Sequence, residues 1–581
     1  MPLDAPGTGR AAFALLGLAL LAALPRSGYS QTPSPAQQVT VALSFSRTVS
    51  PSRPLLVGQN FVNVQPWNRA YDEAHHAFFP EVTAALREER PTVMRFPGGL
   101  FGNTFHWYQT IGPVAQRPPY DFRAMGRGLQ PALTGADEFM KLIEPVPDCQ
   151  ALNIVNISRS KRIGDGTAEE AAAWVAYCNG RAQDTTTIGV DYLGKDWKTV
   201  GYWAGKRAEN GHPAPYNVKY WELGNEINQA PDPDPNDPNN TEFLLTAEEY
   251  VERSRQFIAA MRKVDPAIKI GLVGWTDVLE ATAKDGDRPS SKGGGPWLAT
   301  VIPALKSQTD FFVFHHYNPV TPDISPERDV YPKAVLGYSE AIFVPRLARL
   351  VKVLKEKAPG MPVWVTEYNR VLSWQKGEQT VREQYNLLSG LAVADMLMAM
   401  IREPAVANAD FFEFIGGMGT VFAGDGTSYL GTRYEWGQVV RSPSHWVFSL
   451  FSEPFRQSGG VILKPDVRCG SETVLGYTFP MFNAVAVSRK GNKQIDILLL
   501  NKNIDAAVEC AITFPDIAGK VRSIAAVELN SWEPNSPTPL FDDNLRTQKV
   551  WIKGIEPPTV RGGTITGKLA PHSLVRYRIS L

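Results

Sequence analysis

Short apolar runs alternate with longer amphipathic stretches between residues 50 and 415. Strand-like runs occur at 55–58, 92–96, 152–157, 218–223, 269–273, 311–315, 363–366 and 411–414, and helical patterns lie between them, as at 168–179, 246–264 and 381–401. Strands separated by helical patterns predict parallel β-α-β units. Eight such units predict an α/β protein, a closed (β/α)8 TIM barrel with long loops. The alternative, an open doubly wound sheet, has no G-x-G-x-x-G after an early strand to support it.

From about residue 445 the pattern changes to short strands with turns between them. Such runs lie at 474–479, 484–488, 494–500, 510–514, 523–529 and 573–579. This spacing predicts an all-β sandwich. The early alternating run 39–45 is expected to cross over and complete it. The predicted organisation is therefore a segment 31–50 that joins the sandwich, a barrel over 51–445, and a C-terminal sandwich over 446–581.

The N-terminus has the pattern of a targeting segment. Arg10 precedes an apolar run of 14 residues, 11–24, which is shorter than the ~20 residues that a membrane span requires. Gly28-Tyr-Ser30 supplies a small-x-small cleavage pattern. We therefore predict a signal peptide over 1–30 and a secreted or periplasmic protein with no membrane segment after cleavage. An uncleaved anchor is the alternative.

The four cysteines fall into two pairs that are local in sequence. With three connectivities possible, we favour Cys149–Cys178 and Cys469–Cys510, because each bridge then stays within one predicted domain. The alternative is four free, buried thiols. No C-x-x-C motif or histidine cluster indicates a metal site, and no cofactor is implied.

Charge and composition narrow the classes of partner. The chain has 59 basic and 59 acidic residues, so it lacks the net positive charge that would favour binding to nucleic acid. Fourteen tryptophans and nineteen tyrosines leave ample aromatic surface for stacking on sugars, although most of them are expected in the core. An uncharged carbohydrate fits this composition, and the oligomeric state is not indicated.

Two carboxylates close two of the predicted barrel strands. Glu226 ends Tyr220-Trp-Glu-Leu-Gly-Asn-Glu, and Glu367 ends Val363-Trp-Val-Thr-Glu. The carboxyl ends of barrel strands form the active face, and retaining glycosidases need two carboxylates about 5–5.5 Å apart. We therefore predict Glu226 and Glu367 as catalytic residues. Gly224 permits a sharp turn, and Asn225 places an amide beside the acid, where it can bind a sugar hydroxyl.

Five further residues are predicted to bind substrate or to hold the carboxylates. Arg95, at the end of the second run, could hold the nucleophile by charge-assisted bonds or form a structural ion pair. Tyr317 and His316 end the sixth run, and Tyr317 is a candidate donor to Glu367. One of His315 and His316 is expected to be a buried, structural histidine. Trp107 and Trp275 are the aromatic candidates over the same face.

Other carboxylates compete with this pair. Glu222 lies within its strand and should therefore sit deeper than Glu226. Glu435, in a late loop, is the reserve candidate for the nucleophile. The remaining rivals are Asp165 and Glu413.

These motifs resemble glycoside hydrolases of clan A, and most of all family 51, the α-L-arabinofuranosidases and related endoglucanases. The resemblance rests on Arg95-Phe-Pro-Gly-Gly, Ile111-Gly-Pro, Arg117-Pro, Gly166-Thr-Ala-Glu-Glu-Ala-Ala-Ala-Trp-Val-Ala-Tyr-Cys-Asn179, Tyr220-Trp-Glu-Leu-Gly-Asn-Glu226, Val365-Thr-Glu-Tyr-Asn369 and Ala570-Pro-His-Ser-Leu-Val575. It covers the chain from about residue 50 to the end.

The resemblance implies that Glu226 is the acid/base and Glu367 the nucleophile of a retaining hydrolase, with Asn225 next to the cleaved bond. One departure bears on specificity. Family arabinofuranosidases usually carry a Glu-His pair after the first strand, where this chain has Gly58-Gln-Asn-Phe-Val-Asn63. A heparanase-like β-glucuronidase or an endo-β-glucanase therefore stays open. A transglycosylase and a non-catalytic carbohydrate-binding scaffold are further alternatives.

Overall fold

The computed structural model describes eleven stretches of the chain: 37–62, 70–121, 129–159, 164–228, 244–274, 289–320, 330–370, 382–423, 428–429, 432–433 and 438–581. The predicted signal peptide, 1–30, lies outside these residues, as do Trp275 and Glu435. Within the described stretches, no helix combines the length and the apolarity needed to cross a bilayer.

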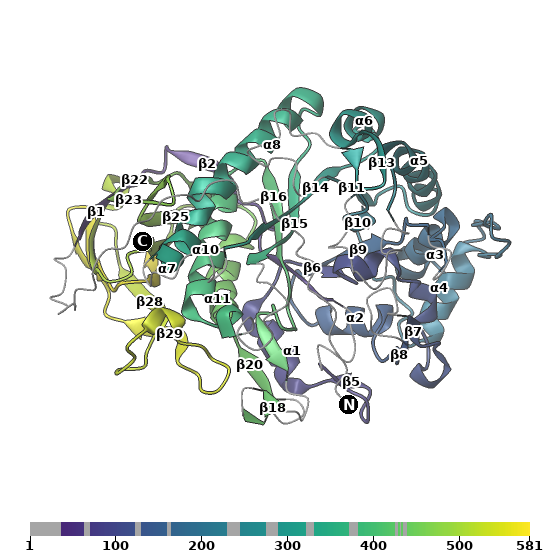
Figure 1. Ribbon diagram of the computed structural model, residues 1–581, viewed down its shortest axis with the longest axis horizontal. Helices are drawn as coiled ribbons and strands as arrows, with labels where there is room; N and C mark the ends of the chain where they lie inside the picture. The colour runs from purple at the N-terminus through teal and green to yellow at the C-terminus, as the bar shows by residue number, and fades with distance from the viewer. Residues whose placement is uncertain are drawn as a thin grey trace, which may run out of the picture.

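Eight parallel strands close into a barrel, as predicted (Figure 1). In chain order they are β3 (Gly58–Asn60), β6 (Val93–Phe96), β9 (Gln150–Val155), β10 (Tyr220–Leu223), β11 (Lys269–Val273), β14 (Phe311–Asn318), β15 (Val363–Arg370) and β16 (Val406–Phe411). Each strand pairs with its neighbours in the chain order, and β16 pairs with β3 to complete the ring.

Helices cover the outside of the barrel. They are α1 (Pro80–Glu89), α2 (Ala136–Ile143), α3 (Ala168–Asn179), α4 (Val200–Glu209), α5 (Ala247–Val264), α6 (Trp297–Leu305), α7 (Val330–Tyr338), α8 (Val344–Lys357), α10 (Leu387–Arg402) and α11 (Pro443–Phe455). Thr167 and Thr246 cap α3 and α5 with their side chains, as the sequence favours at helix starts. The amino ends of helices that follow barrel strands lie at the active face.

The amino-terminal end of the barrel interior is filled with apolar side chains. Phe311 and Trp364 stack with ring centroids 4.2 Å apart, and Tyr220 lies 4.8 Å from Trp364. Val93 and Leu152 complete this small core. The polar side chains of the barrel interior therefore lie at the opposite end, where the carboxyl ends of the strands meet.

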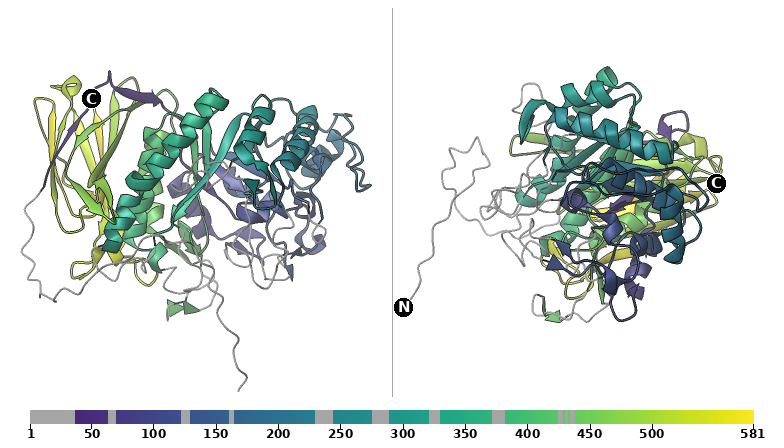
Figure 2. Two further views of the ribbon diagram at one scale, coloured as in Figure 1. Left: turned by 45° about the horizontal axis from the view of Figure 1, so that its top comes forward. Right: turned by 90° about the vertical axis from the view of Figure 1, so that its right-hand side faces the viewer.

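The C-terminal strands form a sandwich of two sheets beside the barrel (Figure 2). One sheet has the order β22 (Asp466–Arg468), β1 (Gln37–Ala42), β27 (Val508–Thr513), β31 (Thr564–Leu569) and β30 (Thr559–Arg561). The other has the order β2 (Thr48–Pro51), β21 (Val461–Leu463), β25 (Phe482–Arg489), β26 (Gln494–Asn501), β32 (Ser573–Ser580), β28 (Ser523–Ser531) and β29 (Val550–Ile555).

The N-terminal strand does enter the sandwich, since β1 runs parallel to β27 and antiparallel to β22. Apolar side chains from both sheets meet in one core, for example Val41, Ile497 and Ile512. The barrel and the sandwich also share a helical layer, because α10 and α11 lie between the barrel strands and the seven-stranded sheet (Figure 1). The domain boundary at 445/446 stays a prediction, and α11 spans that position.

Candidate active site

The two predicted catalytic carboxylates meet at the open end of the barrel. Glu226 lies three residues beyond β10, after a turn in which Gly224 has φ +84° and Glu226 itself φ +46°. A Cβ at Gly224 would lie 2.6 Å from the Ile157 side chain, so only glycine fits there. Glu367 lies within β15. One carboxylate oxygen of each glutamate and a ring nitrogen of His315 all lie within 4.8 Å of one another.

Arg95, at the end of β6, joins the nucleophile candidate to a second carboxylate. Its Nε and Nη2 donate to the two oxygens of Glu222 at 2.7 and 2.9 Å, and its Nη1 donates to Glu367 Oε1 at 2.8 Å. The guanidinium is fully buried. Burial alone would lower the pKa of Arg95, but the charges of Glu222 and then Glu367 outweigh it and raise that pKa above its usual value. Both roles that the sequence predicts for Arg95 therefore apply. It forms a structural ion pair with Glu222, and it also holds Glu367 in place.

Two asparagines complete the hydrogen bonds of Arg95. Asn60 Oδ1 accepts from Nη1 at 2.9 Å, and Asn225 Oδ1 accepts from Nη2 at 2.7 Å. Asn103 holds the backbone of Asn225 from both sides, at 2.6 and 2.9 Å. The Asn225 side chain is thus oriented through its oxygen. Its Nδ2 is buried and has no hydrogen-bond partner among the described residues, which leaves a donor for a ligand hydroxyl.

Tyr317 and His315 project into the barrel from β14. The Tyr317 hydroxyl donates to Glu367 Oε2 at 2.6 Å, as predicted. His315 Nδ1 donates to Glu226 Oε1 at 2.8 Å, and its Nε2 lies 3.0 Å from Thr366 Oγ1. Burial opposes the charge of His315, but Glu367 and the bond to Glu226 outweigh it and raise its pKa. A histidine and two carboxylates are also residue types that bind metal ions. Here, however, both oxygens of Glu367 already accept hydrogen bonds, from Arg95 and Tyr317.

Two predicted substrate-binding residues face away from this site. His316 follows His315 by one residue, so it points out of the barrel and stacks on Phe343 at 4.6 Å and on Tyr338 at 5.7 Å. Burial lowers its pKa to about 3. Trp107 is 1% exposed, stacks on Trp174 and donates its indole proton to the Glu170 carbonyl. Both predictions are wrong because these rings pack in the helical layer around the barrel.

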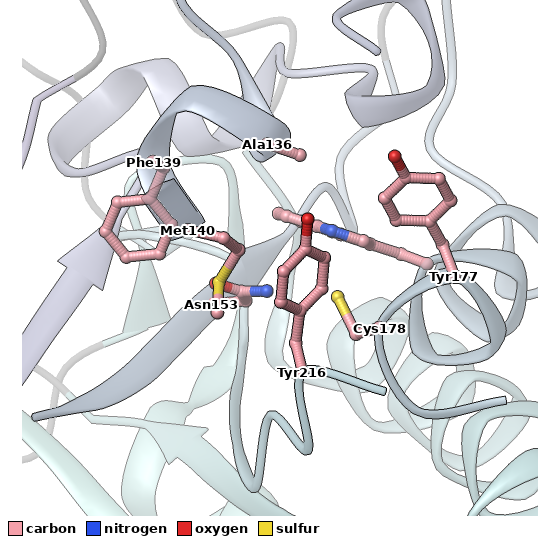
Figure 3. A pocket seen from close by; sticks show the side chains of 8 residues that line it. Ala136, Phe139, Met140, Asn153, Tyr177, Cys178 and Tyr216 are labelled. Carbon is pink, nitrogen blue, oxygen red and sulfur yellow. The ribbon is translucent and has the colours of Figure 1, made fainter. Parts of the chain in front are cut away.

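The predicted disulfides are also wrong, since all four cysteines are free. Strand β1 lies between β22, which Cys469 follows, and β27, which carries Cys510. Two strand spacings of ~4.8 Å place them about 9.6 Å apart, beyond the ~7 Å limit for a bridge. Cys178 lines a small apolar cavity between α2, α3 and β9, together with Met140 and Tyr216 (Figure 3). Neither Glu226 nor Glu367 lines this cavity.

Of the rival carboxylates, Glu413 lies near the nucleophile candidate. It follows β16, and a Cβ at Gly416 would meet its Oε1, so the side chain is folded over its own turn. Burial is the main cause that raises the pKa of Glu413, to about 8, and the charge of Glu367 adds to it. Asp165 instead accepts a bond from Tyr192. Glu222 lies deeper than Glu226, as expected, and anchors Arg95.

The comparisons with known proteins agree with this fold. The family model for the alpha-L-arabinofuranosidase 1 domain matches residues 85–321. An alpha-L-arabinofuranosidase C of Emericella nidulans is 30% identical over 58% of this chain and 59% of its own length. A probable alpha-L-arabinofuranosidase C of Aspergillus niger gives the same identity and the same coverages. The chain therefore spans about three fifths of the length of these curated relatives.

Solved structures share the whole fold at lower identity. An alpha-L-arabinofuranosidase of Thermotoga maritima, in complex with arabinose, has a TM-score of 0.69 at 19% identity, over 94% of this chain and 100% of its own. A family 51 alpha-L-arabinofuranosidase of Bifidobacterium longum has a TM-score of 0.73 at 16% identity, with the same coverages. The barrel with its sandwich is thus the fold that this chain shares with these solved structures. The predicted resemblance to that clan, and within it to family 51, is confirmed.

Proposed function

We propose that this chain is a retaining glycoside hydrolase that acts on a polysaccharide or its oligosaccharides. The proposal rests on the position of two glutamates, Glu226 just after β10 and Glu367 within β15, whose carboxylates each have an oxygen within 4.8 Å of the other. That separation suits a retaining mechanism, which needs about 5–5.5 Å between carboxyl groups, whereas inversion needs ~6.5–9.5 Å to admit a water.

In the proposed mechanism, Glu367 attacks the anomeric carbon while Glu226 transfers its proton to the leaving oxygen. A covalent glycosyl-enzyme forms and the first alcohol departs. Glu226, now ionised, removes a proton from water, and the water oxygen displaces Glu367 to release the sugar. Arg95 and Tyr317 fix the two oxygens of Glu367, and the open Nδ2 of Asn225 is placed to bind a hydroxyl beside the reacting carbon.

An α-L-arabinofuranoside is the proposed substrate. The curated relatives named above carry that activity in their names, and this chain covers only part of their length. The Glu-His pair that family arabinofuranosidases usually carry after the first strand is absent here, and Asn60 instead accepts a hydrogen bond from Arg95. The first-strand residues thus serve the carboxylate network rather than presenting a glutamate to the sugar.

The test compares Glu367→Ala and Glu226→Ala on aryl arabinofuranosides. We expect Glu367→Ala to abolish turnover and added azide to restore it as a glycosyl azide of inverted configuration. Glu226→Ala should keep activity on substrates with acidic phenol leaving groups, and azide should then yield the retained configuration. Unchanged activity in Glu367→Ala would refute the mechanism.

A panel of arabinofuranosides, glucuronides, xylosides and cello-oligosaccharides then defines the sugar. Cleavage of glucuronides alone would replace the arabinofuranoside proposal and keep the mechanism.

We also propose export of the protein, on the basis of the apolar run at 11–24. Detection of the mature N-terminus near Gln31 in the culture fluid is the corresponding test.

A further inference from the structure

A hairpin between α3 and α4 exposes three apolar side chains to solvent. Val190, Tyr192 and Leu193 are 61%, 62% and 58% exposed. The hairpin is marked by antiparallel bridges that pair Thr187 with Thr199 and Val190 with Asp196, and it projects from the right-hand edge of the molecule in Figure 1. Val190, Tyr192 and Leu193 are called the hairpin tip below.

The hairpin tip is held in one conformation from beneath. Asp191 is buried, and its carboxylate accepts bonds from the backbone of Leu193 and Lys195 and from the indole of Trp197 at 2.7 Å. The Lys195 ammonium lies 3.9 Å from the Trp197 ring centroid. A surface that is already ordered loses little conformational entropy when it binds. Exposed apolar groups on such a surface indicate a binding role.

The hairpin tip lies at the active face of the barrel. Asp191 also accepts a bond from Thr167, the N-cap of α3, and the Tyr192 hydroxyl donates to Asp165. Both partners stand between the carboxyl end of β9 and the start of α3. Arg253 of α5, the helix after β10, lies beside the same hydroxyl. Tyr192 therefore lies beside the loop that follows β9, on the outer side of the sector of the barrel that β9 and β10 form.

This sector is the one that carries the acid/base candidate. Gly166 donates to Ser158, Ser158 donates to the Asn103 carbonyl, and Asn103 holds the backbone of Asn225, next to Glu226. An acid/base residue protonates the leaving oxygen, so it stands on the side where the leaving group is bound. Sugars beyond the cleaved bond on that side would extend toward the hairpin tip.

We propose that the hairpin tip is a distal subsite that binds the leaving-group portion of a neutral polysaccharide. This inference rests on the proposed function. The Tyr192 ring offers a face for stacking on a sugar, and Val190 and Leu193 offer apolar contact for its C–H groups. The hydroxyl of Tyr192 already donates to Asp165, which fixes the position of the outer end of the ring. Three side chains provide far less than the ~800 Å² per partner of a stable protein interface, so a sugar suits the area better than a second copy of this chain.

The test separates polymer from small substrate. Tyr192→Ala/Leu193→Ser is compared with Leu475→Ser/Tyr477→Ala, which removes a similarly exposed pair, 54% and 48%, from a hairpin of the sandwich. We expect kcat/KM for soluble arabinoxylan or arabinan to fall about tenfold in the hairpin-tip variant only, because the aromatic and apolar contacts to the polymer are lost. Turnover of an aryl arabinofuranoside should stay within twofold of wild type.

Binding is measured separately from catalysis by affinity electrophoresis in gels containing the same polysaccharides, with Glu367→Gln in each protein. Loss of retardation in the hairpin-tip variant alone supports the subsite. Equal polymer kinetics and equal retardation in all proteins overturn it, as does a change of sedimentation coefficient, which would make the tip a contact between copies. If the wild-type protein cleaves no glycoside but its retardation in the polysaccharide gels depends on Tyr192, the proposed function is refuted while the proposed binding surface is supported.

Discussion

At the residue scale, the site is organised around one cation shared by two carboxylates. Arg95 uses one edge of its guanidinium for Glu222 and the remaining amino group for Glu367. Lysine could not reproduce this fork, since it is a point charge without planar donors. Glu222 therefore fixes the rotation of Arg95, and Arg95 in turn fixes the carboxylate that must approach the anomeric carbon.

Glu413 adds a further carboxyl group near the site. Its pKa is raised to about 8, mainly by burial and further by the charge of Glu367. Above that pH its ionisation places a new negative charge near the proposed nucleophile. We expect kcat/KM of the wild type to fall as pH rises through 8. In Glu413→Gln, which mimics the neutral acid, the alkaline limb should move to higher pH while activity at pH 6–7 stays within about tenfold.

The measurement is a pH profile of kcat/KM on an aryl glycoside, with stability checked at each pH. Glu453→Gln, a charge removal at the end of α11 and far from the barrel mouth, is the matched control. An alkaline limb at the same pH in wild type and Glu413→Gln would show that another group titrates there.

At the element scale, a buried histidine joins two helices. His445, in the first turn of α11, lies 2.5 Å from Glu89 through Nδ1 and 3.0 Å from Glu88 through Nε2, both at the end of α1. Burial opposes its charge, but Glu89 and the two hydrogen bonds outweigh it and raise the pKa of His445. The imidazolium thus connects the helix after the first barrel strand to the helix beneath the sandwich.

This contact predicts a pH-dependent stability. The folded-state pKa of His445 is above the unfolded value of ~6.5, so the stabilisation is fully present below about pH 6.5 and is lost as pH rises through the folded pKa. We expect the free energy of unfolding of wild type to decline over that alkaline range. His445→Gln should be less stable below pH 6.5 and lack this decline.

Urea denaturation at several pH values measures the effect. His75→Gln serves as control, because the His75 side chain is 80% exposed. Parallel pH dependences in wild type and His445→Gln would contradict the assignment.

Element type was easier to predict than element position or side-chain direction. The runs 269–273 and 168–179 match β11 and α3, because apolar periodicity is strong there. The last barrel strand was placed at 411–414, but β16 is Val406–Phe411. It carries buried Asn408 and Asp410, and buried polar groups hide a strand from a hydrophobicity pattern.

In the candidate site, too, some features follow from a local sequence pattern and others do not. Glu226, Glu367, Arg95 and Tyr317 are predictable because each lies in the second half of a barrel strand or just beyond it and has a chemical reason to be there. His315 and His316 could be separated only by knowing which alternates into the barrel. The hydrogen bond from Arg95 to Asn60 depends on the pairing of β6 with β3, which no local pattern encodes.

At the scale of the whole molecule, barrel and sandwich share a buried interface that contains charge. Val487 and Leu498 of the seven-stranded sheet belong to the same apolar core as the barrel helices. Within this layer Lys502, at the end of β26, lies 3.3 Å from Asp395 of α10. Asn483 of β25 donates to Asp395 as well. Burial is the main cause that raises the pKa of Asp395, and Lys502 opposes that rise.

This pair should make the two parts unfold together. Lys502→Met leaves Asp395 buried without its cation, and we expect it to cost about 3–5 kcal/mol of unfolding free energy. Lys502→Met/Asp395→Leu removes both charges, so it should recover much of that loss, since well-packed apolar replacements of a buried pair are often tolerated. Lys493→Met, in the exposed turn between β25 and β26, is the control and should change stability by less than ~0.5 kcal/mol. Urea denaturation followed by circular dichroism measures all four proteins. Because the pair lies between α10 and the sheet, a loss in Lys502→Met that the double variant does not recover would mean that the lysine stem, rather than its charge, holds barrel and sandwich together.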